Sequence, residues 1–255
     1  MPLIHTLALA AGATEYRESD LLVTFFTEEL GKLRALAKGA KRSKKRFGIN
    51  LDLFSLVDLS LREKAGSGLA LVDEASLVNP HLGLRQMLEK VALASYFLEL
   101  TLELTPEREP NRQLFRLLIS ALTFLEKRDP DRKLVSIFEI QALSATGLAP
   151  ELRQCSDCQE DVWKGSRVTF SPAKGSVVCP ACQSGPLLGE PVSVGTLKTL
   201  AAGKILPWDR LNSLRFSAPV ARESQALLEE FIKAQLDKEL KSRRLLDRLV
   251  WGEKV

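Results

Sequence analysis

The chain has 255 residues, of which 45% are hydrophobic and 27% are charged, and this balance excludes a chain that is disordered as its main state. It carries 36 Lys and Arg residues against 32 Asp and Glu residues, so its net charge is only +4. No apolar run approaches the roughly 18–20 residues of a membrane helix. The apolar start of the chain has no Lys or Arg before it, so we expect a strand there and not an export signal.

The first 80 residues predict a β domain. Five short runs are apolar or alternate between apolar and polar residues, and their ranges are 3–9, 21–27, 32–37, 51–61 and 69–78. Turn signals lie between some of these runs, at 28–31 and 66–68. Five short strands joined by glycine-containing turns favour a small barrel, and a five-stranded oligonucleotide-binding barrel is the candidate fold.

The segment 31–50, which we call the basic strip, holds eight cationic residues and no acidic one. Because this charge is twice the net charge of the chain, the excess of positive charge is local. A local cationic surface is typical of polyanion binding, since phosphates that pair with Lys or Arg release condensed counterions. The alternative is a solvated loop or a flexible basic arm. The cationic residues of the strip are Lys32, Arg34, Lys38, Lys41, Arg42, Lys44, Lys45 and Arg46.

Aromatic residues lie close to the basic strip. Phe47 falls within it and Phe54 follows just after it. An exposed ring at such a position stacks on the bases of a single strand, which contributes about 1–3 kcal/mol per base. The alternative is that both rings belong to the barrel core, and for Phe54 we favour this interpretation. Tyr16 and Arg17, in the first loop, form a further pair of low specificity that can stack on a base and contact a phosphate.

After residue 80 the hydrophobic pattern becomes helical. Helical spacing runs through 84–104, 114–125 and 134–145, and it returns at 194–201 and 221–249. We therefore expect an α+β protein whose C-terminal all-α domain is interrupted by a small four-cysteine module. The expected domains are the oligonucleotide-binding barrel at 1–80, the first part of the helical domain at 81–150, the zinc module at 151–186 and the second part of the helical domain at 187–255.

The cysteines form two pairs with metal-ligand spacing, Cys155 with Cys158 and Cys179 with Cys182. Two residues separate the members of each pair, and 20 residues separate the pairs. This spacing predicts one tetrahedral zinc ion, which is structural because four protein ligands leave no position for water. The alternatives are a module that folds without metal and a reduced thiol pair. A redox pair would need a strand–helix–strand context, which the pattern does not predict.

The sequence shows no catalytic set, so we expect that the protein is not an enzyme. Its two histidines, His5 and His81, lie outside any metal-ligand pattern, and no phosphate-loop motif for ATP is present. One alternative is a zinc-ribbon enzyme acting on nucleic acid, such as a nuclease, which would need clustered carboxylates for divalent metals. Another is an RNA-associated protein.

The last predicted helix carries cations that can bind a partner. Lys241, Arg243 and Arg244 lie near its end and can receive an acidic, hydrophobic peptide tail. The alternative is that these cations interact with the negative end of the helix dipole and have no partner.

The sequence resembles the RecO family of bacterial recombination mediator and DNA repair proteins. The resemblance runs in order over almost the whole chain, which makes it more specific than any single motif. It is carried by SDLLVTFFTEELGKLRALAKGAKRSKKRFG at 19–48, LDLFSLVDLSL at 51–61, LASYFLELT at 93–101, GLAPEL at 147–152, FSPAKGSVVC at 170–179 and KSRRLL at 241–246.

The resemblance implies an oligonucleotide-binding barrel, a helical domain and, where all four cysteines are kept as here, a zinc module. It implies a protein that binds single- and double-stranded DNA, anneals complementary strands and, with the partner RecR, helps load the RecA recombinase onto DNA coated by single-strand-binding protein. The acidic C-terminal tail of that coating protein would contact the helical domain, and we expect a cytoplasmic, nucleoid-associated location. The family's basic barrel residues correspond to Lys38, Lys41, Arg42, Lys44, Lys45 and Arg46.

Overall fold

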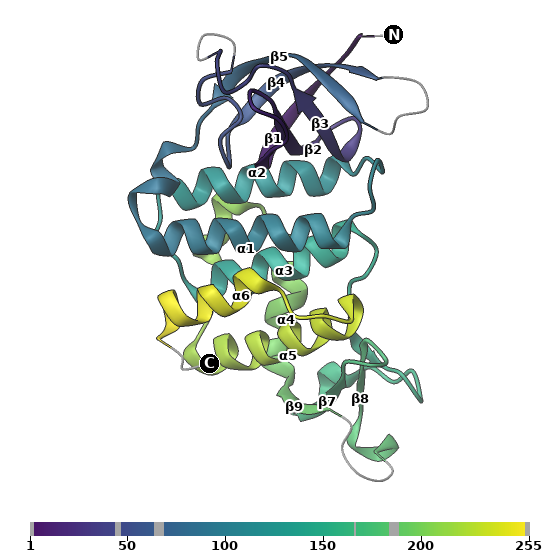
Figure 1. Cartoon of the computed structure of the whole chain (residues 1–255). Helices are drawn as coiled ribbons and strands as arrows, with labels where there is room; N and C mark the ends of the chain where they lie inside the picture. The colour runs from purple at the N-terminus through teal and green to yellow at the C-terminus, as the bar shows by residue number, and fades with distance from the viewer. Residues whose placement is uncertain (1–2, 44–46, 64–68, 166, 184–188, 253–255) are drawn as a thin grey trace. The chain divides into compact units, whose positions relative to one another are not determined.

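The computed structural model describes residues 3–43, 47–63, 69–165, 167–183 and 189–252 (Figure 1). By its internal contacts the chain forms two compact units, Met1–Lys127 and Arg128–Val255. The first unit holds the β-rich part with helices beside it, and the second holds helices with a small sheet that carries the cysteines. The predicted α+β class is therefore confirmed. No helix in the described part of the chain is both long and apolar enough to cross a membrane.

The five strands of the first unit close into a barrel, which confirms the predicted architecture. The strand order around the barrel is β1-β2-β3-β5-β4, and β4 pairs with β1 to complete the ring. Neighbouring strands are antiparallel except β3 and β5, which are parallel where Ala35 lies beside Ala70. The strands are β1 (Leu3–Glu15), β2 (Leu21–Thr27), β3 (Gly31–Ala37), β4 (Leu56–Glu63) and β5 (Ala70–Asn79).

The expected strand at 51–61 is shorter in the structure, because β4 begins only at Leu56. Phe54 has a left-handed backbone with φ of 69°, which ends the preceding turn and cannot continue a strand. The side chain of Phe54 is buried, as the core interpretation predicted. Its carbonyl oxygen accepts a hydrogen bond from the ring of the buried His81 at 2.8 Å, so this turn is also tied to the start of the helices.

The barrel interior is filled by alternate residues of its strands. Val23 and Phe25 of β2 and Leu33 and Ala35 of β3 point inward, as the two-residue period of a strand requires. The outer face of β2 is also covered, because Phe26 packs against Phe115 with ring centroids 5.8 Å apart. Burial of both faces of β2 explains why its sequence is apolar almost throughout.

Helices α1 (Leu88–Leu104) and α2 (Arg112–Glu126) belong to the first unit and follow the short helix η1 (Leu82–Gln86). α2 begins after Asn111, whose side-chain oxygen accepts a hydrogen bond from the backbone N–H of Leu114 at 2.9 Å. The connection from α1 to α2 lies against the turn from β2 to β3. There the Lys32 ammonium donates to the carbonyl oxygen of Leu102 at 2.6 Å, and Arg116 pairs with Glu28 at 3.0 Å.

The second unit begins with α3 (Arg132–Ala145) and contains a sheet in the order β6-β8-β7-β9. Phe138 and Trp208 form part of its core, with ring centroids 6.4 Å apart. The Trp208 indole donates to the side-chain oxygen of Gln141 at 2.9 Å, so this buried polar pair is satisfied. The remaining elements are β6 (Glu151–Cys155), η2 (Val162–Lys164), β7 (Arg167–Ser171), β8 (Ser176–Val178), η3 (Pro180–Cys182), β9 (Glu190–Ser193), α4 (Val194–Gly203), η4 (Trp208–Ser213), α5 (Ala218–Leu236), α6 (Lys241–Leu246) and η5 (Asp247–Trp251).

The expectation of one long helix over 221–249 is wrong. α5 ends at Leu236, Asp237 adopts a left-handed backbone with φ of 52°, and α6 begins only at Lys241. The apolar period continues through the break, because both helices bury residues against the same unit, so sequence periodicity alone does not reveal it. Asp is one of the residues that tolerates a left-handed conformation, which is the local signal for the break.

Gly31 and Gly39 provide a matched test of the packing between the barrel and the α1–α2 connection. Both have φ of +67°, but a Cβ added at Gly31 would overlap the backbone of Glu109, whereas a Cβ at Gly39 would meet nothing within 4 Å. We expect Gly39→Ala to lower the free energy of unfolding by about 1–2 kcal/mol through backbone strain alone. Gly31→Ala should lower it by clearly more. Denaturant unfolding of the two full-length variants measures the difference, and equal losses would contradict this packing.

Candidate metal centre and nucleic-acid surface

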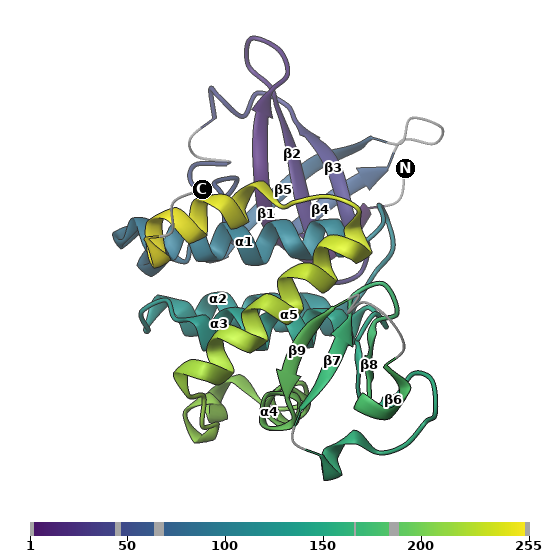
Figure 2. The same cartoon turned by 90° about the horizontal axis from the view of Figure 1, so that it is seen from below.

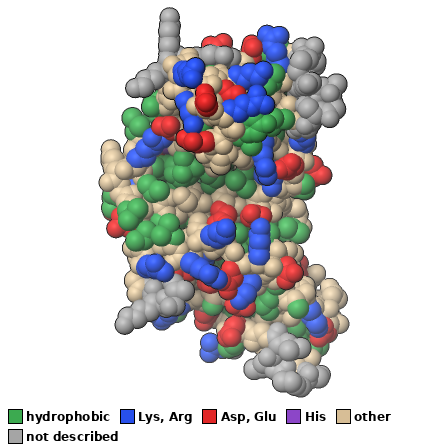
Figure 3. Space-filling model, viewed as in Figure 1, with side chains coloured by type: hydrophobic (Ala, Val, Ile, Leu, Met, Phe, Trp, Pro, Cys, Tyr) green, Lys and Arg blue, Asp and Glu red, His purple; other side chains and the backbone are tan. Residues whose placement is uncertain are grey.

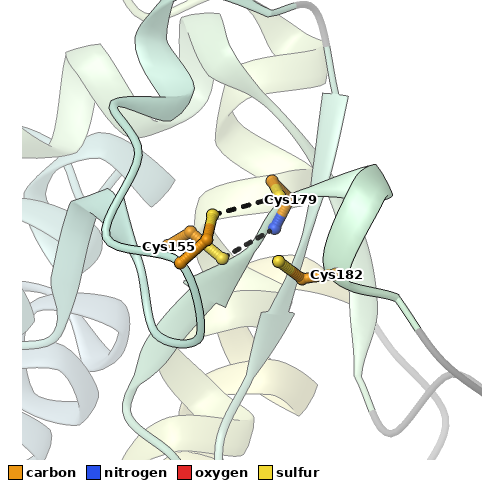
Figure 4. A group of neighbouring side chains, drawn as sticks. Cys155, Cys179 and Cys182 are labelled. Carbon is orange, nitrogen blue, oxygen red and sulfur yellow. Dashed lines mark hydrogen bonds between the residues drawn. The ribbon is translucent and has the colours of Figure 1, made fainter.

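The four cysteines that the sequence singled out lie together in the second unit. Their Sγ atoms are all within 4.8 Å of one another, and the Sγ atoms of Cys158 and Cys179 are 3.7 Å apart. Zn–S bonds of about 2.3 Å in a tetrahedron place neighbouring sulfurs about 3.8 Å apart, so the cluster fits one ion. Figure 4 shows the side chains of Cys155, Cys179 and Cys182 converging on one point.

Local backbone structure brings the cysteines together. Cys155 ends β6 and Cys158 lies in the turn after it, while Cys179 follows β8 and Cys182 ends η3. Because β6 and β8 are neighbouring strands of the sheet, the two pairs meet at the same edge. The backbone N–H of Cys179 donates to the Cys155 Sγ at 3.3 Å, which links the two pairs directly (Figure 4).

Hydrogen bonds within the cluster push its thiol pKa values apart. Burial raises the pKa of Cys155, but the backbone N–H groups of Cys158, Cys179 and Asp157 outweigh this effect and lower it to about 6. Hydrogen bonds with Cys158 and Cys179 raise the pKa of Cys182 to about 12. Cys155 therefore loses its proton most readily, whereas hydrogen bonds with Cys158 and Cys179 favour the protonated form of Cys182. A cation among the four sulfurs would favour deprotonation and let all four bind as thiolates.

The cysteine module packs into the helical unit. Phe170 of β7 meets Phe231 of α5 edge to face, with ring centroids 5.7 Å apart, and Figure 2 shows the strands lying beside α5. Arg167 pairs with Glu223 of α5 at 3.8 Å, while Lys174 pairs with Asp157 inside the module at 2.6 Å. These contacts with α5 connect the folding of the cysteine module to that of the helices.

We expect one divalent metal ion per chain in the purified protein. Cys155→Ser should lower the metal content well below one ion per chain and lower the unfolding temperature, because structural zinc in small peptides contributes about 10–16 kcal/mol of apparent binding energy at neutral pH. Glu160→Ser, at an exposed position in the same segment, is the control and should change neither quantity. Elemental analysis and thermal unfolding give the two readings. A stably folded protein without metal, and insensitive to Cys155→Ser, would contradict this site.

The structure divides the basic strip into parts with different surroundings. At its start, Lys32 donates to the carbonyl of Leu102 near the end of α1, and Arg34 lies 3.9 Å from Glu107 in the α1–α2 connection. β3 ends three residues after Arg34, and the next cation of the strip is Lys38, six residues or about 20 Å of extended chain after Lys32. Lys44, Lys45 and Arg46 lie outside the described residues.

The described cations after β3 meet the turn between β1 and β2. Lys41 pairs with Glu15 at 2.8 Å, and Arg42 lies 4.0 Å from Glu18, whereas Lys38 is exposed. Although the strip is free of acids in sequence, acids from other segments therefore approach it in space. Figure 3 shows the same mixture, with Asp and Glu among the Lys and Arg side chains over the barrel. Sequence reasoning missed Glu15, Glu18 and Glu107 because only the barrel fold brings them close.

Asp20 holds this turn against the strip. Its carboxylate accepts a hydrogen bond from the backbone N–H of Gly39 at 2.9 Å, and the backbone N–H of Lys41 donates to the Ser19 carbonyl at 3.0 Å. The hydrogen bond from Gly39 is the main cause that lowers the pKa of Asp20, and the nearby charges of Arg17 and Lys38 act in the same direction. The carboxylate is thus charged at neutral pH, and it fixes the turn beside the cations.

The structure corrects the expectation that Phe47 stacks on a base. The side chain of Phe47 is only 1% exposed and belongs to the barrel core together with Leu51. The end of the strip, from Phe47 on, packs onto the barrel together with Leu51, so the ring is shielded from water. Phe47 is therefore not available to a ligand at the surface.

Arg243, expected to contact a peptide tail, is instead buried within the second unit. Its guanidinium pairs with Glu139 at 3.1 Å, Glu229 at 2.7 Å and Asp247 at 3.1 Å, and its side chain is 8% exposed. A buried cation that three carboxylates already surround cannot receive a partner without breaking this network. Arg244 is exposed and pairs with Glu239, and Lys241 is also exposed.

A cavity of about 440 Å³ lies in the same unit, where α5 faces the start of α3. Its volume is within the range of about 300–1,000 Å³ that ligand pockets occupy. Small apolar side chains and two arginines contribute to its wall, and Arg222 is exposed. The lining residues are Arg132, Ala218, Ala221, Arg222, Gln225, Ala226 and Glu229.

The closed barrel, the helical unit and the four-cysteine cluster define an α+β protein of barrel-and-helix architecture whose cysteines could hold one metal ion. Two family models match nearly all of the chain. Recombination protein O N terminal matches residues 1–81, and Recombination protein O C terminal matches residues 85–244. The chain therefore belongs to the RecO family of DNA repair proteins, which are non-enzymatic recombination mediators.

Relatives over the full length give the same result. The DNA repair protein RecO of Syntrophus aciditrophicus is 38% identical over 236 residues, which cover 92% of this chain and 91% of that protein. The DNA repair protein RecO of Desulfatibacillum aliphaticivorans is 36% identical over 256 residues, 98% of each chain. The protein of the same name from Anaeromyxobacter dehalogenans strain 2CP-C is 36% identical over 237 residues, 93% of each chain.

Proposed function

We propose that the protein binds DNA through the cations that follow β3, anneals complementary single strands and, with RecR, helps load RecA onto DNA coated by single-strand-binding protein. The observation that carries the DNA site is the position of Lys38, Lys41 and Arg42 beside the β1–β2 turn of a closed barrel. Lys44, Lys45 and Arg46 follow directly in sequence and join the proposed site. Family membership supports the wider role, and as a bacterial DNA repair protein it would act in the cytoplasm, at the nucleoid.

The ion pairs at this surface do not prevent phosphate binding. The side chains of Arg42 and its partner Glu18 are 76% and 95% exposed, whereas Lys41 is 29% exposed and its partner Glu15 is 80% exposed. Exposed pairs of this kind contribute only about 0–1 kcal/mol each, so a phosphate can displace the carboxylate. Contacts of cations with phosphates are independent of sequence and leave the base edges free to pair. Neutralising the phosphates also reduces the repulsion between two strands, which favours annealing.

Zinc is the ion we propose for the four cysteines. Four thiolates in a tetrahedral arrangement select zinc or an iron–sulfur cluster, and sulfurs within 4.8 Å of one another fit a single ion. Zinc held by Cys155, Cys158, Cys179 and Cys182 would order the module and its contact with α5.

For the acidic tail of single-strand-binding protein we propose the α3–α5 cavity as the docking place. Arg243 is buried and already pairs with three carboxylates, which argues against the last helix as the main contact for the tail. The alanine side chains of α5 offer an apolar wall for a hydrophobic tail residue, and Arg222 offers a charge for the acidic ones. Lys241 and Arg244 remain outlying cations that can attract the tail at long range.

Reversing charges after β3 tests the DNA site. Each phosphate contact contributes a slope of about −0.7 to the dependence of log K on log salt for single strands. We expect Lys38→Glu/Arg42→Glu to weaken binding to single-stranded DNA and flatten this slope by about 1.4, as measured by fluorescence anisotropy at several salt concentrations.

The matched control is Arg210→Glu/Arg215→Glu, which makes the same change in net charge at exposed positions in the second unit. It should leave the slope unchanged. If both double variants alter the slope equally, net charge and not a site on the barrel governs binding, and the proposed surface is wrong.

A peptide that carries several acidic residues and ends in phenylalanine tests the tail site. We expect it to bind the full-length protein and to bind Arg222→Glu about tenfold more weakly, because a charge-assisted hydrogen bond is replaced by repulsion. Lys241→Glu/Arg244→Glu should have a smaller effect. Calorimetric titration decides between the two places, and the reverse order of effects would assign the tail to the last helix instead of the cavity.

A further inference from the structure

We propose that Tyr16 is the residue on which the protein stacks a base of single-stranded DNA, and that this contact gives a preference for unpaired over duplex DNA. The proposal rests on the proposed DNA-binding function and adds to it a residue that distinguishes unpaired from duplex DNA. Phosphate contacts alone cannot supply that distinction, because both forms of DNA offer phosphates.

Tyr16 is the only exposed aromatic residue in the part of the chain that the structure describes, and this part includes all 11 Phe, 2 Tyr and 3 Trp. Its relative exposure is 47%, whereas that of Phe47 is 1%. The ring of Trp163 faces the cations of Arg153 and Lys198 in the helical unit and is partly covered. A π face for a base is therefore offered at the barrel surface by Tyr16.

The β1–β2 turn holds Tyr16 in a defined place. The backbone N–H of Tyr16 donates to the Asp20 carbonyl at 3.1 Å, which closes the turn. Asp20 in turn accepts the N–H of Gly39, so the turn is fastened to the segment that carries Lys38 and Lys41. In Figure 2 the turn is the purple loop that extends beyond the ends of β1 and β2. A ring on a fastened turn loses little conformational freedom when it binds a base.

The neighbours of Tyr16 are those that a stacked nucleotide needs. The Arg17 guanidinium lies over the ring, 5.4 Å from its centroid, and adds a cation at the same point. Glu15, the residue before Tyr16, pairs with Lys41 at 2.8 Å, which places a strip cation one residue from the ring. A base on Tyr16 would thus have its phosphates beside Arg17 and Lys41. A duplex buries the faces of its bases in the stack and cannot use this contact except at its ends.

Substitution of Tyr16 in the full-length protein tests the proposal. Stacking on an aromatic residue is sequence-tolerant, so a thymine oligonucleotide and a mixed duplex of equal length are suitable probes. We expect Tyr16→Ala to weaken single-strand binding about tenfold, leave duplex binding unchanged and leave the salt slope unchanged, because no cation is lost. Tyr16→Phe keeps the ring and should bind both forms as the wild type does.

The outcomes separate this proposal from the one on which it rests. If Lys38→Glu/Arg42→Glu flattens the salt slope while Tyr16→Ala binds single strands normally, the cation site stands and the stacking role is wrong. If Tyr16→Ala weakens single-strand and duplex binding equally, the residue positions the turn and does not recognise unpaired bases, which also overturns the proposal. If the charge-reversed variant retains normal affinity and slope, the cation site itself fails.

Photocrosslinking gives a second, independent reading on the unaltered protein. A single strand that carries 5-iodouracil reacts on irradiation with an aromatic ring stacked against it, and mass spectrometry of the digested complex identifies the peptide. We expect the adduct at Tyr16. Adducts at other residues with none at Tyr16 would place the stacking contact elsewhere and overturn the proposal.

Discussion

Both ends of β3 are tied to other segments of the first unit, and this constraint decides what the basic strip can do. At the start of the strand, Lys32 donates to the Leu102 carbonyl and Gly31 lies against the backbone of Glu109, so this end serves the packing of barrel and helices. After the strand, Asp20 accepts the N–H of Gly39 and holds the β1–β2 turn in place. The cations that we propose for phosphate binding lie after β3 and begin at Lys38, about 20 Å along the chain from Lys32. A strip that is continuous in sequence therefore consists of two parts with different contacts.

The second unit contains two clusters of ionisable side chains, one around Arg243 and one made of the four cysteines. Around Arg243, three carboxylates satisfy one buried cation, which ties α6 to α3 and α5 without a ligand. At the cysteines, hydrogen bonds lower the pKa of Cys155 and raise that of Cys182, so the four thiols do not ionise alike. The first cluster is complete within the chain, whereas the second could hold a metal ion among its four sulfurs. This difference is why the cysteines indicate a metal centre and the arginine network does not.

The sequence predicted what depends on local period and spacing. Alternation in the first 80 residues indicated the strands, and the spacing of Cys155, Cys158, Cys179 and Cys182 indicated a cluster that the structure brings together. It did not predict what depends on contacts between distant segments. The basic strip alone does not reveal its contacts with Glu15 and Glu107. These acids approach the strip only when the barrel closes and α1 and α2 pack beside it. Similarly, Arg243 resembled a surface cation because Glu139, its partner at 3.1 Å, is 104 residues away.

Annealing imposes opposite demands on a DNA-binding surface, and the proposed site meets both. The strand must be held firmly enough to compete with a coating protein, yet its bases must stay free to pair. Exposed cations such as Lys38 and Arg42 would bind phosphates through weak, additive and exchangeable contacts, so neighbouring base edges would remain open. A row of aromatic rings would instead retain each base and oppose pairing. With Phe47 in the core and Tyr16 alone exposed among the described aromatic residues, stacking at the barrel is limited to one position. One stacked base distinguishes a single strand from a duplex while the rest of the strand can pair.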